Sequence, residues 1–468
     1  MSKVNTLLTP TWNRLALNGT KVELPLVAAD AGACGEGGAG GVGGDGVCGE
    51  GERGACEGGE VAFEHGSSWC ELSAADFDAA WAAFEEEARA KSAYRTTLRS
   101  TSDVDTAPAL AQAAKAKDAL DIPAKDAVPR SAVSSALGEE ALIWIKSAAQ
   151  GANTARAYSV ANYTNAQEPL VVRVKAAPGI TAALVDVLVE KGAHASIRLQ
   201  ADSPAPGTGT VAIALRVIAQ QGAHVDIATL QTLDKSWAYL ESIEVKTADN
   251  AVVDTAQTYL GGGASYGGYG AALHGFRSSC KVKTNYLGAE NALDMNFLIR
   301  HFGKQTKSDL QANGVLGAQA NKSLRATIDL IHGAKGARGH ELESVLIADE
   351  GAKNKSLPII LCDEDDVQGN HGATIGHVPA SQRYYLAARG LDDAAVNALF
   401  MKASFEKAYV EAFDAQAAQS VNRLAVAVLG SCVACKDREE AEDTSTTCPA
   451  IASHSPKTNA TSTAESGE

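Results

Sequence analysis

The sequence predicts a mainly β protein, on the evidence of its apolar pattern, its turn residues and a weak repeat. Between Leu170 and Leu260, segments rich in Val, Ile and Thr alternate with turns of Gly, Asn and Asp, as expected of β-strands. No long amphipathic helix separates these segments, which argues against alternating strands and helices. The predicted strands are 170–175, 181–190, 196–199, 211–220, 225–229, 240–246 and 252–260.

A weak internal repeat accompanies these strands. Gly192-Ala-His194 and Gly222-Ala-His224 lie 30 residues apart, each between two predicted strands. Farther along, small-residue corners follow at steps of 15, 14 and 16, at Gly288, Gly303, Gly317 and Gly333. Steps near 15 that double to 30 are typical of a flattened β-solenoid, in which each coil is stable only when stacked on its neighbours. A β-sandwich with glycine turns fits the same pattern, so periodicity alone leaves both architectures open.

Composition limits the partners and the compartment. The formal charge of −15 over 468 residues disfavours nucleic acid and anionic membranes, because both attract chains rich in Lys and Arg. No apolar run approaches the roughly 18 residues of a membrane-spanning helix, and residues 1–10 lack the regions of a signal peptide. We therefore expect a cytoplasmic protein. The nine cysteines, an odd number, argue against a disulfide framework.

The chain divides by composition into several regions. Residues 31–60 are dominated by Gly with scattered Cys and Glu, a composition that buries too little surface to fold. Behind Ser73, a predicted N-cap, Phe77 and Trp81 recur at helical spacing. The predicted regions are an ordered N-terminal segment (1–30), a disordered Gly/Cys-rich insertion (31–70), a helical region with linker (71–150), a β core (151–378), a helical C-terminal domain (379–430) and a disordered acidic tail (431–468).

After Pro379 the apolar period becomes helical. Asp392 and Asp393 are predicted to cap a helix whose apolar stripe covers 392–413, and the helical pattern continues to Gly430. This stripe either packs on the chain's own core or stays open for a partner. Composition does not separate the two.

The most informative stretch is 354–390. It is predicted to contain a buried strand at 358–361, an acidic group at 363–366, a polar turn that carries His371 beside Gly372, and then a helix. It reads His-Gly-Ala-Thr-Ile-Gly from position 371 and Tyr-Leu-Ala-Ala-Arg-Gly up to position 390. Neither motif is a signature of catalysis.

These motifs resemble the C-terminal signature of the SufB/SufD family of iron–sulfur cluster assembly proteins, and within it the SufD type. Thr11 and Trp12 are also similar to the entry segment of that type, and the resemblance covers residues 5–25 and 150–415. It implies a right-handed parallel β-helix (β-solenoid) core with helical N-terminal and C-terminal segments, working as a scaffold and not as an enzyme.

The resemblance also implies partners and a site. The C-terminal helices would bind the SufC ATPase, and the β-helix would pair with a SufB-like partner or with a second copy of this chain. A transient iron–sulfur cluster would form at that interface, where the SufD-type histidine corresponds to His371. The residues implied for docking SufC are Tyr384, Tyr385, Arg389, Phe400, Phe405 and Tyr409.

His371 is also a reasonable ligand on chemical grounds, because a neutral imidazole suits iron. The alternative is a histidine that only bonds the backbone of its turn. SufD-type members often carry Cys two residues earlier, where this chain has Gly369, so that thiolate is missing. Cys362 is a weaker candidate ligand, and Cys280 weaker still, since a lone strand cysteine is usually a small buried apolar residue.

Cys432 and Cys435 form a CxxC pair, but a zinc or cluster site generally needs a second pair. We interpret this pair, and the irregularly spaced Cys34, Cys48 and Cys56, as incidental metal binders. The chain has no Walker A sequence, no nucleophile elbow and no His-Glu-x-x-His. ATP hydrolysis is therefore expected only in SufC.

Two other functions remain open. A purely structural β-solenoid would stabilise SufC without binding iron, and Gly369 favours this reading. A carbohydrate-active β-helix enzyme would carry acidic and aromatic side chains along one face. Residues 170–230 instead carry mostly Ala, Val and Ile, which ranks this class last.

Overall fold

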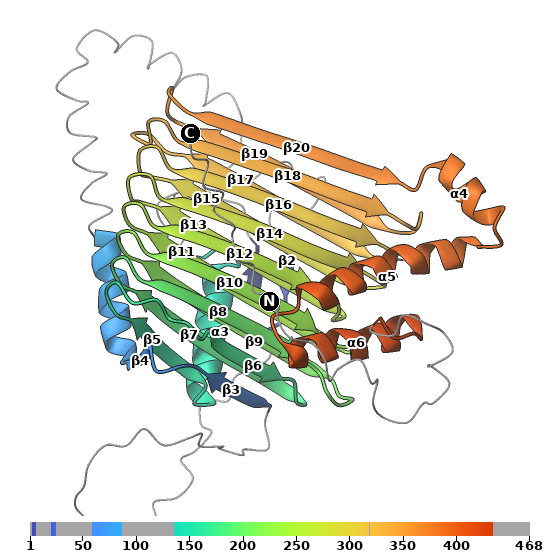
Figure 1. Cartoon of the computed structure of the whole chain (residues 1–468), viewed down its shortest axis with the longest axis horizontal. Coiled ribbons are helices and arrows are strands. Elements are labelled where there is room, and N and C mark those ends of the chain that lie inside the picture. Colours follow the sequence, from blue (N-terminus) through green and yellow to red (C-terminus); the bar gives the residue numbers. More distant parts are fainter. Residues whose placement is uncertain (1, 6–19, 25–58, 87–134, 318, 434–468) are drawn as a thin grey trace, which may run out of the picture. The chain divides into compact units, whose positions relative to one another are not determined.

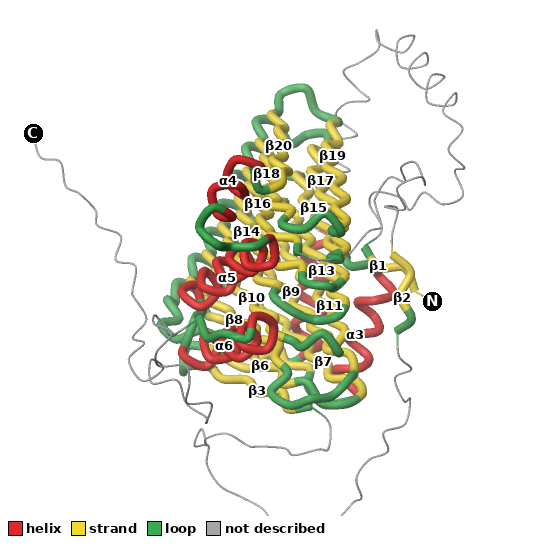
Figure 2. The backbone as a smooth tube through the Cα atoms, turned by 90° about the vertical axis from the view of Figure 1, so that its right-hand side faces the viewer, coloured by secondary structure: helices red, strands yellow, loops and turns green. Residues whose placement is uncertain are grey.

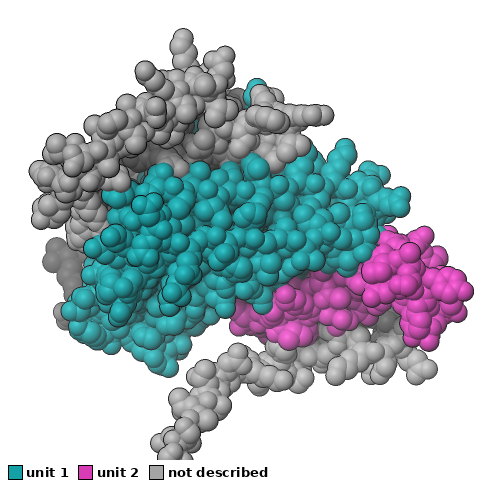
Figure 3. Space-filling model, turned by 90° about the horizontal axis from the view of Figure 1, so that it is seen from above, with its two compact units in different colours: residues 1–377 teal, residues 378–468 magenta. Residues whose placement is uncertain are grey.

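The computed structural model of the chain describes residues 2–5, 20–24, 59–86, 135–317 and 319–433. It divides into two compact units, residues 1–377 and 378–468 (Figure 3). The first unit holds every strand of the described chain, and the second holds three helices. Thr11, Trp12, Cys435, residues 31–58 of the predicted insertion and residues 434–468 of the tail lie outside the described residues.

The first unit is a parallel β-solenoid, as predicted (Figure 1). Two nine-stranded sheets face each other, and consecutive strands alternate between them from β5 to β20. Within each sheet these strands pair in parallel, whereas a sandwich of the kind considered above is antiparallel. One sheet, called the even-numbered sheet after its strands from β6 to β20, contains β3 (Glu60–Glu64), β6 (Leu170–Lys175), β8 (His194–Asp202), β10 (His224–Thr232), β12 (Val252–Tyr259), β14 (Ser279–Gly288), β16 (Lys307–Leu316), β18 (Arg338–Ile347) and β20 (Gln368–His377). The other, called the odd-numbered sheet after its strands from β5 to β19, contains β4 (Trp69–Leu72), β5 (Ala155–Val160), β7 (Gly179–Val189), β9 (Gly209–Ala219), β11 (Trp237–Thr247), β13 (Ala264–Leu273), β15 (Ala292–His301), β17 (Asn321–Leu330) and β19 (Lys353–Cys362).

The predicted repeat corresponds to one coil. His224 pairs with His194 in neighbouring strands, so the two Gly-Ala-His sequences mark the same corner in successive coils. Gly192 and Gly222 turn that corner with φ of 64° and 69°, a left-handed conformation that glycine adopts without strain. The next coils place Asn250, Arg277 and Gln305 there, with φ of 57°, 58° and 58°.

Inward-pointing side chains fill the space between the sheets. In the early coils they are aliphatic, and Val185, Val187, Ile213, Leu215 and Ile227 are each at most 2% exposed. β-branched side chains suit a pleated surface, and each buried one contributes about 1.5–3 kcal/mol. This apolar filling holds successive coils together.

The helix α3 (Glu139–Gly151) lies along the outer face of the odd-numbered sheet (Figure 2). Its Leu142 and Ile145 pack against residues of that sheet. The strand positions below the helix are small, for example Ala182 and Ala212. Such residues let a helix approach the sheet closely. Val4 of β1 (Ser2–Val4), which pairs with β2 (Thr20–Val22), belongs to the same apolar cluster.

The insertion predicted for 31–70 is wrong at its C-terminal end. Residues 60–64 and 69–72 form β3 and β4, which pair antiparallel with β6 and β5. Trp69 is 4% exposed and donates from Nε1 to the Glu168 carbonyl at 2.9 Å. This short apolar segment orders because it gains sheet partners distant in sequence.

A helix follows at residues 74–86, as predicted. Its N-cap is Ser73, whose Oγ accepts from the Asp76 backbone N–H at 3.0 Å. Phe77 is fully buried and clusters with Trp81 and with residues of the odd-numbered sheet. The helix therefore covers part of that sheet.

The second unit contains α4 (Ala380–Ala387), α5 (Asp393–Glu411) and α6 (Ala415–Leu429). Asp392 caps α5 as predicted, by accepting from the Ala395 backbone N–H. The predicted continuous helix is interrupted, because Asp414 accepts from Ala417 N–H and starts α6. Gly430 ends α6 with φ of 66°. Within the described part of the chain, no helix is both long and apolar enough to cross a membrane.

Candidate functional site

The final coil, β19 and β20, carries the residues that the sequence motifs singled out. The prediction of a turn at His371 is wrong, because His371 lies within β20 and pairs with Glu341 of β18. The turn lies earlier, between Cys362 and Gln368. Glycine-rich residues 368–377 have low strand propensity, and the register with β18 overrides it.

His371 lies on the inner face of its strand. Side chains at paired positions of neighbouring strands point to the same face, and its partner Glu341 is 4% exposed between the sheets. A Cβ at Gly369, two residues away on the same face, would lie 2.9 Å from Ile360 of the opposite sheet. His371 itself is exposed, because no further strand of the described chain stacks on β20.

A buried polar group lies deeper in the stack, with members on β14, β17 and β18. Lys322, Glu343 and Tyr286 are each at most 2% exposed. The Lys322 ammonium donates to Glu343 and, at 3.0 Å, to Ser356. Tyr286 also donates to Glu343. The sequence analysis missed this group, because each member sits alone in its own strand.

Burial shifts the acidity of these groups. It raises the pKa of Glu341 to about 7, with the neighbouring Glu343 carboxylate adding to the rise and Lys322 opposing it. Burial lowers the pKa of Lys322, although the Glu343 carboxylate opposes the change. Glu341 is therefore partly protonated near neutral pH, directly beside the strand position of His371.

The acidic group at 363–366 shapes the turn before β20. Glu364 is 8% exposed and accepts from the Gly333 backbone N–H at 2.8 Å. Burial alone would raise its pKa, but hydrogen bonds from Gly333 and Asp365 N–H and the nearby His332 lower it overall. This carboxylate therefore anchors the turn to the preceding coil.

The candidate cysteines occupy different surroundings. Cys362 ends β19 and is exposed, which corrects the expectation of a buried side chain, and its thiol donates to the Glu364 carbonyl at 3.3 Å. Its strand partner Leu330 faces the interior, so Cys362 and His371 lie on the inner face of the same coil. Cys280 is buried, as expected, and burial raises its pKa to about 12. Cys432 donates to Asn422 Oδ1 at 3.0 Å.

The final coil also leaves two strand edges without a partner in the described chain. Most of β20 is exposed, including Ile375 at 44%, although its strand partner Val345 is only 4% exposed. Unpaired edges are templates for the strands of another chain. The final coil therefore offers an imidazole, a thiol and free edges together.

The residues predicted to dock a partner differ in exposure. Tyr384 and Tyr385 are 78% and 54% exposed, and Arg389 stacks 3.6 Å from the centre of the Tyr385 ring. Phe400 and Tyr409 are half-buried. Phe405 is fully buried, so in this fold it supports the helices and does not face a partner.

Comparison with known proteins agrees with the fold. Residues 172–404 match the family model described as SUF system FeS cluster assembly, SufBD core domain. The chain is 33% identical over 120 residues to the iron–sulfur cluster assembly protein SufD of Bacillus subtilis, a match that covers 25% of this chain and 28% of that protein.

Two further relatives belong to the same family. A SufBD family protein of Mycobacterium tuberculosis is 25% identical over 139 residues, which cover 30% of this chain and 16% of the relative. One from Synechocystis is 30% identical over 94 residues, which cover 20% and 19%. None of these three matches spans more than 28% of the relative's length. Through the SufBD core domain that residues 172–404 match, the chain belongs to the SufB/SufD family of SUF-system iron–sulfur cluster assembly proteins.

Proposed function

We propose that this chain is a SufD-like scaffold that contributes His371 to the site where an iron–sulfur cluster is assembled. The observation that carries the proposal is the position of His371, which is exposed on the inner face of the uncovered final coil. An imidazole placed there is accessible to iron while its strand is held by a complete ladder with β18.

The ligand set of the final coil is incomplete for a cluster. Fe–S clusters are generally held by four ligands, mostly thiolates, and this coil supplies His371 and at most the Cys362 thiol. Gly369 adds no ligand. The remaining ligands must come from a second chain, so the proposed site lies at an interface and the cluster is a transient cargo.

The free edges of β19 and β20 support such an interface. A second solenoid, either a SufB-like paralogue or another copy of this chain, can extend both sheets by edge pairing. The inner faces of the two final coils would then meet. The Glu341 carboxylate, one strand below His371, is placed to accept a hydrogen bond from the imidazole or to take up a proton.

The helical unit supplies a separate docking surface for the SufC ATPase in this proposal. Tyr384, Tyr385 and Arg389 form an exposed aromatic and cationic patch on and after α4, and such residues are enriched at interface centres. Phe405 plays no direct part, because it is buried.

The second candidate is a structural subunit that stabilises SufC and its partner without binding iron. Gly369 supports it, because the strand that carries His371 has no thiol of its own. The two functions differ in whether His371 is needed for cluster loading.

The deciding experiment is anaerobic reconstitution of the chain co-expressed with its SufC and SufB-like partners. We compare wild type with His371→Ala by iron content and visible absorbance, and use His340→Ala as the matched control, since His340 is exposed on the opposite face of the neighbouring strand. Loss of cluster in His371→Ala alone, with the complex intact by gel filtration, supports the scaffold role. Equal loading in all three assigns the chain to the structural role.

A further inference from the structure

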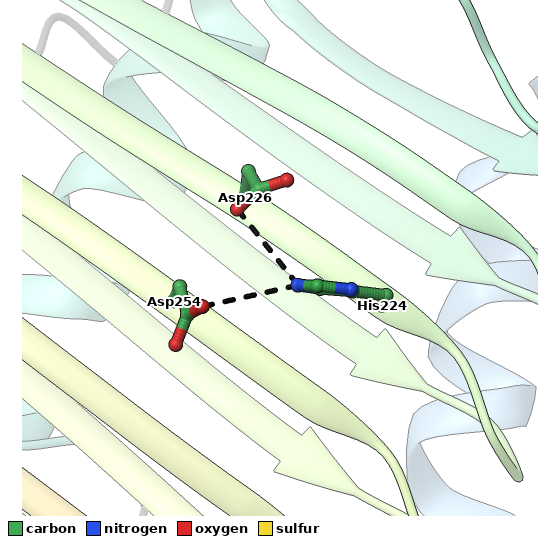
Figure 4. A group of neighbouring side chains, drawn as sticks. All are labelled: His224, Asp226 and Asp254. Carbon is green, nitrogen blue, oxygen red and sulfur yellow. Dashed lines mark ion pairs between the residues drawn. The ribbon is translucent and has the colours of Figure 1, made fainter. Parts of the chain in front are cut away.

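A second group of potential metal ligands lies on the outer face of the even-numbered sheet. His224 and Asp226 come from β10 and Asp254 from β12, and the two carboxylates flank the imidazole (Figure 4). His224 Nε2 lies 3.9 Å from Asp226 Oδ1 and 3.8 Å from Asp254 Oδ2. One donor atom from each of the three lies within 4.8 Å of the others. Three potential metal-ligand atoms, one from each side chain, therefore lie close together.

The register between neighbouring strands of the solenoid brings these three side chains together. Asp226 and Asp254 are direct partners in the parallel pair of β10 and β12, and His224 precedes Asp226 by two residues on the same face. His224 belongs to the Gly-Ala-His repeat, and its ring lies 5.3 Å from that of His194, the same position one coil earlier. The repeat thus brings a second imidazole beside the first.

The imidazole has an unmet bonding capacity. His224 Nε2 is shielded from solvent and has no hydrogen-bond partner, because both carboxylate oxygens are beyond hydrogen-bond distance. Asp226 and Asp254 each form an ion pair with His224. The nearby Arg198 donates to the Asp226 backbone carbonyl at 3.1 Å. The Arg198 guanidinium also interacts electrostatically with the Asp226 carboxylate, and a bound cation would compete with it there.

We propose that His224, Asp226 and Asp254 bind one divalent transition-metal ion, of the Zn²⁺ and Fe²⁺ class. Imidazole and carboxylate together suit these ions. Bonds of about 2.1 Å place the ligand atoms of a tetrahedral ion about 3.4 Å apart. The two His–Asp distances must therefore shorten by roughly half an ångström, and the distance between the two carboxylates, which is at most 4.8 Å, by at most about 1.4 Å. The fourth position is left for water or His194.

This site is separate from the proposed cluster site. β10 and β20 are five steps apart in the strand order, which is about 24 Å at the usual strand spacing. His224 faces outward and His371 inward. The two proposals therefore stand or fall independently.

Equilibrium dialysis of the full-length chain against Zn²⁺ tests the site, with bound metal measured by elemental analysis. The variants are His224→Ala and Asp254→Asn, and the matched control is His340→Ala, an exposed histidine on the same outer face of the same sheet. Cysteines elsewhere bind zinc equally in all four proteins, so only differences count. We expect each site variant to bind one equivalent less than wild type, and the control to bind as wild type does.

Thermal unfolding supplies a second readout, because a ligand that binds only the folded state raises Tm. Zn²⁺ should raise the Tm of wild type and His340→Ala more than that of the site variants, whose metal-free Tm should be unchanged. Equal zinc content in wild type and His224→Ala overturns the proposal, and so does an equal loss in His340→Ala, which indicates adsorption to any surface histidine. In either case the three residues form only the ion pairs of His224 with Asp226 and Asp254 and do not bind a metal ion.

Discussion

The two ends of the solenoid are finished in opposite ways. At the first end, the direction of the chain reverses, and the short strands β3 and β4 pair antiparallel with β6 and β5. At the last end, β19 and β20 are full ten-residue parallel strands with no strand beyond them in the described chain. A stack of coils has no natural end. Two short antiparallel strands therefore end the stack at the first, closed end, whereas no strand of the described chain follows the full-length strands at the last, open end.

The interiors near the two ends differ as well. Near the first end the inward side chains are Val, Ile and Ala, a dry core that supplies stability. Near the last end they include Lys322, Glu341 and Glu343. Burying charges costs free energy unless they are paired. The contrast teaches that apolar filling and buried charged groups occupy different regions of one continuous core.

The largest expected effect comes from breaking the buried pair at the open end. Lys322→Ala leaves Glu343 buried without its cation, and we expect a loss of about 3–5 kcal/mol in the free energy of unfolding. Denaturant titration followed by circular dichroism measures it. The control is Lys175→Ala, which removes an exposed ion pair with Glu60 near the closed end and should cost at most about 1 kcal/mol. Equal losses in the two variants would contradict the contrast between the ends.

A substitution at the closed end of the solenoid should lower the free energy of unfolding somewhat less. Trp69→Ala removes a buried side chain and its hydrogen bond to Glu168, and we expect a loss of about 3 kcal/mol. Hydrogen exchange should show faster exchange in β4 and β5, with β19 and β20 unchanged. Faster exchange across the whole solenoid would instead mean that the ends do not unfold separately.

The third effect depends on pH. The pKa of Glu341 is about 7 in the folded protein, above the usual value of about 4.3, so the native state binds the proton more tightly. This carboxyl's contribution to stability is therefore present at pH 4 and is lost as pH rises through 7. Glu341→Gln should be more stable than wild type at pH 8 by about 1–2 kcal/mol, a figure reduced for solvent screening, and nearly equal at pH 4. A difference independent of pH would refute the assignment.

The smallest effect on stability should come from the exposed edge itself. Ile375 is 44% exposed on β20, so Ile375→Lys should change the free energy of unfolding by less than about 0.5 kcal/mol. It should nevertheless weaken any pairing of the final coil with a second chain. Sedimentation velocity of the chain, alone and with its SufB-like partner, measures this pairing. Unchanged association would place the interface elsewhere.

Much of the fold could be predicted from the sequence, because strand alternation and corner residues are local signals. Gly192 and Gly222 marked the corner, and Ser73 and Asp392 marked helix starts. The segment at 60–72 was missed because its strands are specified by partners 85 to 115 residues away in the sequence, not by their own composition.

The candidate site was only half predictable. His371 was found by its motif, but its strand was not, since residues 368–377 form a strand only by matching β18. The polar group beneath it gave no signal, because nothing local relates Lys322 to Glu343. Their meeting depends on coil length and on which alternate positions face inward, both of which are fixed only when the coils stack.

The aligned corners have an evolutionary consequence. Because each coil repeats the same corner hydrogen bonds and register, a whole coil can be duplicated or deleted while the neighbouring surfaces still match. Such an event moves the last end by one strand spacing, about 4.8 Å, without rebuilding the group around His371. The insertion of a single residue within a strand would instead turn every later side chain of that strand to the opposite face. Solenoids of this kind can therefore become longer or shorter by whole coils while the side chains of the final coil stay the same.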